Sequence, residues 1–432
     1  MALPAAEDAY VFRHALVRDA AYELQPPSAR ARLHGLALGC LEELTGGRPD
    51  ETPVAIDDGA TDAHPCDAVA LQLADHAGLA EPGTVGDRAA LRCLYLRRAA
   101  EHAERLHQYP QARQLWSQLI PLAQPGARPR CLLRLAMAAG RAGDNAAAVA
   151  ALETLNADAA LEPELRCMGH SRLSHFLREL GRHAPAEAAA TFARELARAS
   201  GLAMHEAWAL GNLANLHRDT GRAAEAEQGY ARALDVFQRL GNQRYAAVAL
   251  GNLAALRQMA GDTAMAEHQY RRALQLCREA GDLRFEGISL GNLAIVLQQQ
   301  ARLVDAAQAY DQALEIHRRT GNRRSEGITL GNLAGMLRQA GQPRQALAAY
   351  ESALAMHREL SNRSFEGAHL CYFALCLVDL RRADEARAAW RAGMAILHEL
   401  GDRMQAERAR QPMLETCRKA GMPPLDEPEA AP

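Results

Sequence analysis

The pentapeptide Leu-Gly-Asn-Leu-Ala occurs four times in this chain, always 40 residues apart, at 210–214, 250–254, 290–294 and 330–334. The same 40-residue frame carries a small residue and a large aromatic residue at constant positions after each pentapeptide. These are Ala226, Ala266, Ala306, Ala346 and Ala386, and Tyr230, Tyr270, Tyr310, Tyr350 and Trp390. A unit of 40 residues cannot bury an apolar face alone, so such units stack and share one continuous core. The repeat therefore predicts a solenoid.

Each copy predicts two antiparallel helices. Gly221, Gly261 and Gly341 are placed to close the first helix in a left-handed conformation, and Arg302 and Arg382 fall near that turn in the two copies that lack the glycine. The second helix is expected to end at a small residue that is followed by a helix-capping residue. The end residues are Gly241, Gly281, Gly321, Ser361 and Gly401, and the caps are Asn242, Asp282, Asn322, Asn362 and Asp402.

Composition supports helices that pack closely. Hydrophobic residues reach 49% of the chain while aromatic residues are only 5%, so alanine and leucine supply most of the apolar content. We expect Ala214 and Ala226 to face each other across one helix pair, because two methyl side chains let the backbones approach closely. Tyr230 and its equivalents would then fill the space between neighbouring pairs. The fold class predicted from the residues is all-α, built from antiparallel helix pairs.

The pattern of a small residue followed by Ala-x-x-x-aromatic-x-x-Ala, seen at Ala226, Tyr230 and Ala233, resembles the tetratricopeptide repeat in a longer, 40-residue form. The resemblance covers about residues 203–403. It implies a right-handed superhelical solenoid with a concave groove lined by the first helices. In this family the groove is where a partner peptide or helix binds.

Weaker copies precede the regular ones, and the expected organisation follows from them. Helix pairs are predicted near 87–121, 129–156 and 164–199. The predicted segments are a cap at 1–44, a linker at 45–67, degenerate repeats at 68–200, regular repeats at 201–403, a capping helix at 404–420 and a disordered tail at 421–432.

The N-terminal segment carries Phe12-Arg13-His14-Ala15-Leu16-Val17-Arg18-Asp19-Ala20-Ala21-Tyr22. This motif resembles the winged-helix-like segment that follows the ATPase core in bacterial regulators of the signal-transduction ATPase type. The chain departs from that family because it has no G-x-x-x-x-G-K-[S/T] loop, and its only lysine is Lys419. We therefore expect no ATP hydrolysis by this chain. The segment is interpreted as a remnant of such a regulator, or as evidence of an ATPase encoded upstream.

No residue pattern predicts catalysis, a metal site or a cofactor. The histidine pairs His170/His175 and His102/His107 are five residues apart and do not match the spacing of a helical zinc site. The recurring Glu206, Glu286, Glu326 and Glu366 are expected to form a charged rim rather than an acid–base pair. A formal charge of −3, no long apolar run and no N-terminal signal favour a cytoplasmic protein that binds neither nucleic acid nor membrane.

The sharpest candidate site is the Gly-Asn dipeptide inside each first helix. Glycine costs about 1 kcal/mol in a helix relative to alanine, and asparagine is also a poor helix former. The candidate peptide-binding residues are Asn212, Asn252, Asn292 and Asn332, with Trp208, Val248, Ile288 and Ile328 one turn earlier and Tyr245 and Phe285 before them. Three interpretations stay open: the amides bind a ligand backbone, they bond a neighbouring repeat, or they were inherited by duplication without a role.

The function expected from these features is a non-catalytic scaffold that captures a partner peptide or helix in the groove. The alternative is the sensor portion of a signalling regulator whose ATPase lies upstream or in a separate chain. Arginines in the turns are expected either to favour an acidic partner or to form a solvated edge; they are Arg244, Arg284, Arg323, Arg324 and Arg363. The oligomeric state stays open.

Overall fold

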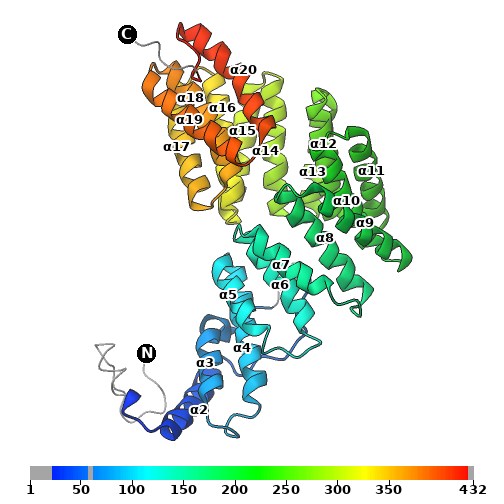
Figure 1. Ribbon diagram of the computed structural model, residues 1–432, viewed down its shortest axis with the longest axis vertical. Coiled ribbons are helices and arrows are strands. Elements are labelled where there is room, and N and C mark those ends of the chain that lie inside the picture. Colours follow the sequence, from blue (N-terminus) through cyan, green and yellow to red (C-terminus); the bar gives the residue numbers. More distant parts are fainter. Residues whose placement is uncertain (1–21, 57–61, 427–432) are drawn as a thin grey trace. The chain divides into compact units, whose positions relative to one another are not determined.

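The computed structural model describes residues 22–56 and 62–426, and within these ranges it is all-α, with no β-strand (Figure 1). The chain divides into two compact units, residues 1–159 and 160–432. This confirms the fold class expected from the repeat.

Unit 1 contains six α-helices and one 3-10 helix within its described residues. They are α2 (Pro27–Leu44), η1 (Pro65–Val69), α3 (Ala70–Leu79), α4 (Arg88–Arg105), α5 (Tyr109–Leu119), α6 (Arg128–Arg141) and α7 (Asn145–Asn156). The helix pairs expected near 87–121 and 129–156 are therefore present as α4–α5 and α6–α7.

Part of the segment expected as a linker, 45–67, packs against the helices of unit 1. Val54 is buried, and Arg98 donates to the backbone oxygen of Asp62 at 2.9 Å. Arg98 also forms an ion pair with the buried carboxylate of Asp67, with Nε and Oδ1 2.7 Å apart. The segment follows α2 in extended form and is held to α4 by arginine side chains, so its described residues do not behave as a free tether.

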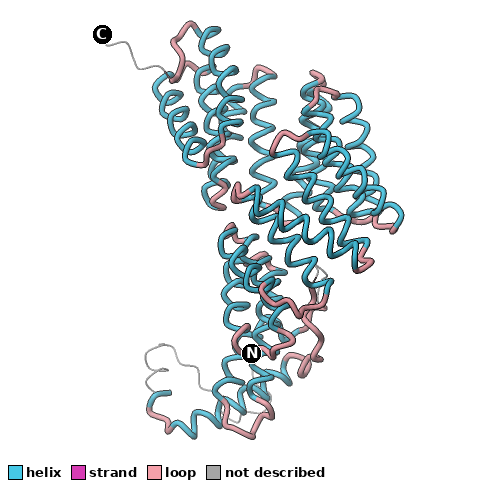
Figure 2. The backbone as a smooth tube through the Cα atoms, turned by 45° about the vertical axis from the view of Figure 1, so that its right-hand side comes forward, coloured by secondary structure: helices cyan, strands magenta, loops and turns pink. Residues whose placement is uncertain are grey.

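Unit 2 consists of six helix pairs and a final helix. They are α8 (Pro163–Glu179), α9 (His183–Ala199), α10 (Ala203–Asp219), α11 (Ala223–Arg239), α12 (Gln243–Met259), α13 (Thr263–Glu279), α14 (Leu283–Gln299), α15 (Leu303–Arg319), α16 (Arg323–Gln339), α17 (Pro343–Glu359), α18 (Arg363–Asp379), α19 (Ala383–Glu399) and α20 (Arg403–Ala420). Three-residue turns join the helices of unit 2 from α8 to α20 (Figure 2).

The turns follow the predicted chemistry with one correction. Gly221, Gly261 and Gly341 have positive φ angles of 77°, 83° and 76°. In the two copies without glycine the left-handed residues are Ala301 and Arg381, with φ of 60° and 61°, rather than the following Arg302 and Arg382. The backbone there adopts the same turn without the residue that favours it, because the packing of the two helices on either side determines the turn.

The predicted caps are present in four of five cases. The side chains of Asn242, Asp282, Asn322 and Asp402 each accept a hydrogen bond from a backbone amide in the first turn of the next helix. Asn362 does not cap its helix. Its side-chain nitrogen instead lies 3.3 Å from Nδ1 of the buried His357.

The conserved frame of small and aromatic residues forms the contact between helices, as predicted. Ala214 of α10, Ala226 and Tyr230 of α11, and Leu253 of α12 lie in one buried cluster. Tyr230 therefore bridges one helix pair to the next. The same arrangement recurs with Ala254, Ala266, Tyr270 and Leu293.

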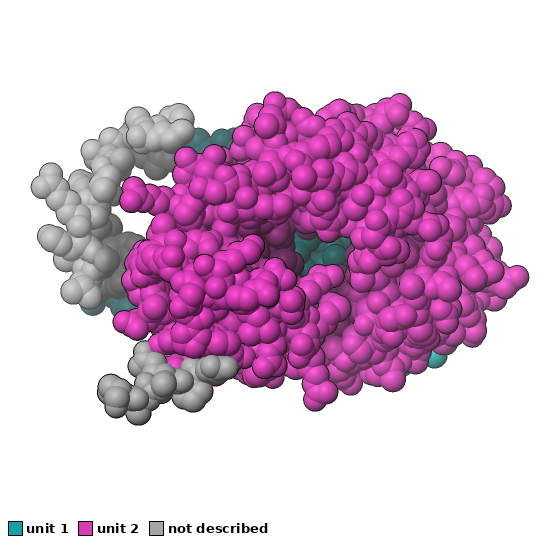
Figure 3. All heavy atoms as spheres, turned by 90° about the horizontal axis from the view of Figure 1, so that it is seen from above, with its two compact units in different colours: residues 1–159 teal, residues 160–432 magenta. Residues whose placement is uncertain are grey.

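The first helix of each pair lies on the inner side of unit 2. Among the described residues, successive first helices contact each other at α8–α10, α12–α14, α14–α16, α16–α18 and α18–α20, whereas no such contact joins successive second helices. A stack that is tighter on one side curves toward that side, so the first helices line the concave face. The space-filling view of unit 2 shows an opening at its centre (Figure 3).

The expected charged rim of glutamates is wrong for three of its four members. Glu286, Glu326 and Glu366 are buried, and only Glu206 is half-exposed. Each buried carboxylate accepts a hydrogen bond from an arginine near the end of the preceding second helix, at 2.7, 2.9 and 3.0 Å. The donors are Arg278, Arg318 and Arg358. These ion pairs connect consecutive repeats, because the first turn of each first helix packs beside the last turn of the helix before it.

Buried histidines form a second set of internal polar groups. His317 and His357 occupy the same position in α15 and α17, and burial lowers the pKa of each to about 4. His369 in α18 is also buried; its Nδ1 lies 2.9 Å from Nε2 of His357, and burial lowers its pKa to about 3. All three are therefore neutral imidazoles in the folded protein at neutral pH.

We predict that acid destabilises the fold through these histidines. An unfolded histidine has a pKa near 6.5, so below that pH the unfolded chain binds protons that the folded chain excludes. Stability contributed by the neutral imidazoles is complete above pH 6.5 and is lost as the pH falls toward 4. Urea unfolding of the full chain between pH 7 and pH 5 measures this slope.

His317 provides the specific test, since its Nδ1 is buried without a hydrogen-bond partner. His317→Leu reduces the proton uptake on unfolding near pH 5.5 by roughly one. The control is His268→Leu, a change at an exposed position of α13. An unchanged pH slope in His317→Leu would contradict the prediction.

Candidate functional site

The inner face of unit 2 carries the two rows of residues expected from the sequence. The asparagine row consists of Asn212, Asn252, Asn292 and Asn332, all half-buried. One helical turn earlier lies a row of larger apolar side chains, also half-buried: Trp208, Val248, Ile288 and Ile328. The structure therefore brings both predicted rows to the inner helices, where they run side by side along the concave face.

The four asparagines do not share one environment. The side-chain nitrogen of Asn212 donates to the backbone oxygen of Ser171 in α8, at 2.9 Å. Within the described part of the chain, the side chains of Asn252, Asn292 and Asn332 make no hydrogen bond. Asn212 thus links two repeats, whereas the other three amides leave their donors and acceptors available in the groove.

The aromatic candidates belong to the packing between repeats. Trp208 meets Tyr245 edge-on with ring centroids 5.2 Å apart, and Tyr245 stacks on Phe237 at 5.4 Å. Phe285 packs at the margin of the same buried cluster. These rings are half-buried and mutually in contact, so they form one wall of the groove rather than separate open pockets.

The glycines of the Gly-Asn dipeptides also differ. A Cβ atom added at Gly211 or Gly251 would meet no atom within 4 Å, and at Gly291 it would lie 3.5 Å from Oγ1 of Thr329. At Gly331 it would collide with the imidazole of His369. Packing therefore requires glycine in the fourth copy but not in the first two.

Three residues of the inner face were not predicted, because their helices have lost the pentapeptide. Arg172 of α8 and Tyr372 of α18 occupy the positions of the asparagine row, since 212 − 40 = 172 and 332 + 40 = 372. His175 lies one turn after Arg172, at the position of Asn215. The 40-residue offset, extended into the degenerate copies, was the signal that identifies them.

The electrostatics at this end of the groove are governed by arginine. Burial lowers the pKa of His175 to about 4, and the charges of Arg178, Arg172 and Arg324 lower it further while Glu179 opposes them. Arg324 belongs to α16, far from α8 in the sequence. The curvature of unit 2 therefore brings α16 close enough to α8 for Arg324 to act on His175.

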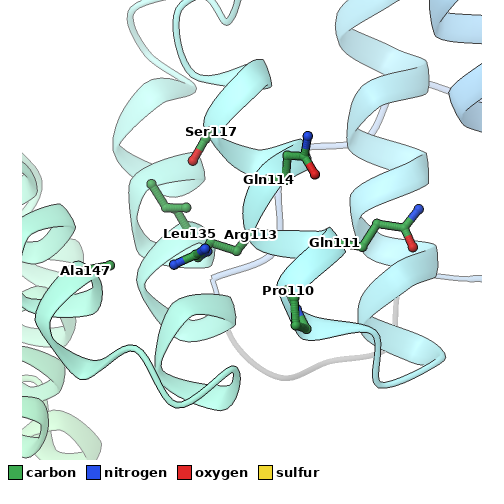
Figure 4. A pocket seen from close by; sticks show the side chains of 7 residues that line it. All are labelled: Pro110, Gln111, Arg113, Gln114, Ser117, Leu135 and Ala147. Carbon is green, nitrogen blue, oxygen red and sulfur yellow. The ribbon is translucent and has the colours of Figure 1, made fainter.

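The described residues show no arrangement suited to catalysis or metal binding. No group of three or more His, Cys, Asp or Glu side chains lies close enough to hold a metal ion in the described part. A depression between α5, α6 and α7 in unit 1 is lined by Pro110, Gln111, Arg113, Gln114, Ser117, Leu135 and Ala147 (Figure 4). None of these residues pairs a nucleophile with a base. In the part of the chain that was searched, no helix has the length and apolar character needed to cross a bilayer.

The fold and the inner face define a helical-repeat solenoid with a concave, amide-bearing surface. The family model of the tetratricopeptide repeat matches residues 205–279 and 286–359, which contain the helix pairs from α10 to α17. The chain is a tetratricopeptide-repeat protein. No curated protein sequence matches it significantly.

Solved structures share the architecture. The chain is 12% identical to the Rap protein complexed with competence and sporulation factor, with a TM-score of 0.59 over 78% of this chain and 93% of that one. It is 14% identical to the apo quorum sensor NprR from B. thuringiensis, with a TM-score of 0.54 over 71% and 88%. At these identities the likeness concerns the fold alone.

A third structure bears on the N-terminal resemblance. A Signal Transduction ATPase with Numerous Domains (STAND) protein with a tetratricopeptide repeat sensor, from Pyrococcus horikoshii, is 14% identical. Its TM-score is 0.50 over 93% of this chain and 67% of that chain. The chain thus resembles regulators of this type in fold, while the motif at 12–22 lies, except for Tyr22, outside the described residues.

We predict opposite effects of one substitution at equivalent positions. Gly211→Ala and Gly251→Ala each raise the free energy of unfolding by about 0.5–1 kcal/mol, because alanine favours the helix and the space is free. Gly331→Ala lowers it by about 1–3 kcal/mol, because the new methyl group displaces His369 from a packed site. Urea unfolding of the three variants measures the difference, and equal effects at all three positions would contradict it.

Proposed function

We propose that this chain is a non-catalytic scaffold that captures a partner peptide in the concave groove of unit 2. The observation that carries the proposal is the set of unbonded amides at Asn252, Asn292 and Asn332, aligned along the inner face beside an apolar row. Asparagine amides both donate and accept, so a row of them can bond the backbone of an extended segment whatever its side chains.

The neighbouring apolar row supplies the second element of recognition. Val248, Ile288 and Ile328 are half-buried, so they present apolar surface to the groove without the large exposed patch that promotes aggregation. A bound peptide would place alternate side chains against this row and its backbone against the amides. The Rap structure, of similar fold, is a complex with competence and sporulation factor, which is consistent with a ligand in such a solenoid.

A second candidate is the sensor portion of a signalling regulator of the signal-transduction ATPase type. It is supported by the motif at 12–22 and by the fold similarity to the STAND protein over 93% of this chain. In that case the groove binds the effector, and a separate or upstream ATPase is the responding partner.

The proposal predicts loss of binding when the free amides are removed. A full-length variant with Asn252, Asn292 and Asn332 changed to Ala should fail to retain a partner that the parent retains from a lysate of the source organism. Its helical content by circular dichroism should equal that of the parent, since none of these side chains bonds another described residue.

Asn212→Ala is the matched control, because Asn212 bonds the neighbouring repeat. It should reduce stability by about 1 kcal/mol and leave capture largely intact. Equal retention of the partner by the parent and the triple variant would sink the groove as the binding site. Retention of one ATPase by both proteins would favour the second candidate.

A further inference from the structure

One position on the inner face is arginine in three consecutive repeats. Arg244, Arg284 and Arg324 are the second residues of α12, α14 and α16, and they are 40 residues apart. Each precedes a member of the apolar row by one helical turn. The three arginines therefore extend the rows of the groove at its edge, on the same helix face as the asparagines.

The first arginine has an internal partner. Nε of Arg244 forms an ion pair with Oδ2 of Asp282 at 2.6 Å, and Asp282 is the residue that caps α14. The corresponding caps of the next two repeats are Asn322 and Asn362. The repeat that retains the carboxylate neutralises its own arginine, and the next two repeats carry a neutral amide instead.

Arg284 and Arg324 consequently have no ion pair within the described residues, and both are exposed. The amides that replaced the carboxylate gain little from the change: Nδ2 of Asn322 is buried without a partner. Its Oδ1 still accepts from the backbone amide of Ser325, so helix capping is retained while the negative charge is gone. Two guanidinium groups are thus left without a counter-charge in adjacent repeats.

The charges of these arginines act on the interior of unit 2. Arg324 lowers the pKa of His175 in α8 and of His357 in α17, and Arg284 lowers that of His317. Arg172, beside His175, likewise forms no ion pair in the part of the chain described. The one carboxylate acting on His175, that of Glu179, is hydrogen-bonded to Arg178.

We infer that the groove selects an extended acidic peptide, whose carboxylates take at Arg284 and Arg324 the place that Asp282 takes at Arg244. This inference rests on the proposed function and specifies its ligand. Neighbouring first helices stand about 8–10 Å apart, and an extended chain advances about 3.1–3.4 Å per residue. Two acidic residues about three positions apart would therefore reach both arginines, with an aliphatic side chain between them over Ile288 or Ile328.

The rows favour a peptide over a nucleic acid of similar charge. Between the arginines and the asparagines lies an aliphatic row, which contacts apolar side chains and offers no surface for stacking bases. The chain as a whole carries a formal charge of −3. The positive charge is confined to a few positions on the inner face, where it suits a short acidic segment.

The test uses the full chain and random ten-residue peptides displayed on phage, followed by fluorescence anisotropy of the best labelled peptide. Asn322→Asp gives Arg284 the internal partner that Arg244 has, and Arg324→Gln removes the second charge. Asp282→Asn does the reverse and frees Arg244. Asp and Asn cap helices equally well, so the fold is retained in both exchanges. Arg319→Gln, on the second helix α15 and exposed, is the control for loss of one positive charge.

The expected result is enrichment of Asp and Glu in the selected peptides. Asn322→Asp and Arg324→Gln each weaken binding about threefold to tenfold, Asp282→Asn strengthens it about twofold to fivefold, and Arg319→Gln leaves it unchanged. Added salt should weaken binding to the parent more than to Arg324→Gln.

Other outcomes separate this inference from the function on which it rests. If selected peptides bind, are lost with the triple asparagine variant, and are neither acidic nor affected by Asn322→Asp, the acidic specificity is wrong and the peptide-binding groove stands. If no peptide is lost with that variant, the proposed function and this inference both fail. If a ten-nucleotide single strand displaces the peptide at equal concentration, the inferred ligand class is wrong.

Discussion

The close contact between alanines of paired helices determines the rest of unit 2. Ala214 against Ala226 lets two backbones approach, and the space left beside them is filled by Tyr230 from one side and Leu253 from the next pair. Because the tyrosine belongs to one pair and is buried by another, no pair is complete without its neighbour. Stability in such an array is the sum of these interfaces, and their regular geometry sets the curvature that creates the groove.

The sequence predicts the helix pairs and their turns well, because those depend on local residues and on a spacing repeated five times. It predicts less well which way a side chain faces between repeats. Glu286, Glu326 and Glu366 are charged residues in the first turn of a helix, which usually lies in solvent, yet they are buried against the preceding helix. The ion pair with an arginine eight residues earlier becomes visible only when the turn between the helices is known.

The candidate site was located by sequence, but its internal differences were not. Four identical dipeptides suggest four identical roles, whereas Asn212 bonds the neighbouring repeat and Gly331 is required by His369. These distinctions arise from residues 40 positions away, in helices that have diverged. Arg172 and Tyr372 were missed for the same reason, since the motif that identifies their position is absent from α8 and α18.

The exchange of Asp for Asn at one helix cap has a consequence for how such a groove evolves. Either residue caps the helix, so a change between them leaves the fold and its stability nearly unaffected. The change nevertheless decides whether the arginine one repeat earlier is neutralised from within or left to face the groove. A repeat protein built in this way can shift the charge preference of its binding surface in single, structurally silent steps, one repeat at a time, and duplicated copies can diverge in specificity before they diverge in structure.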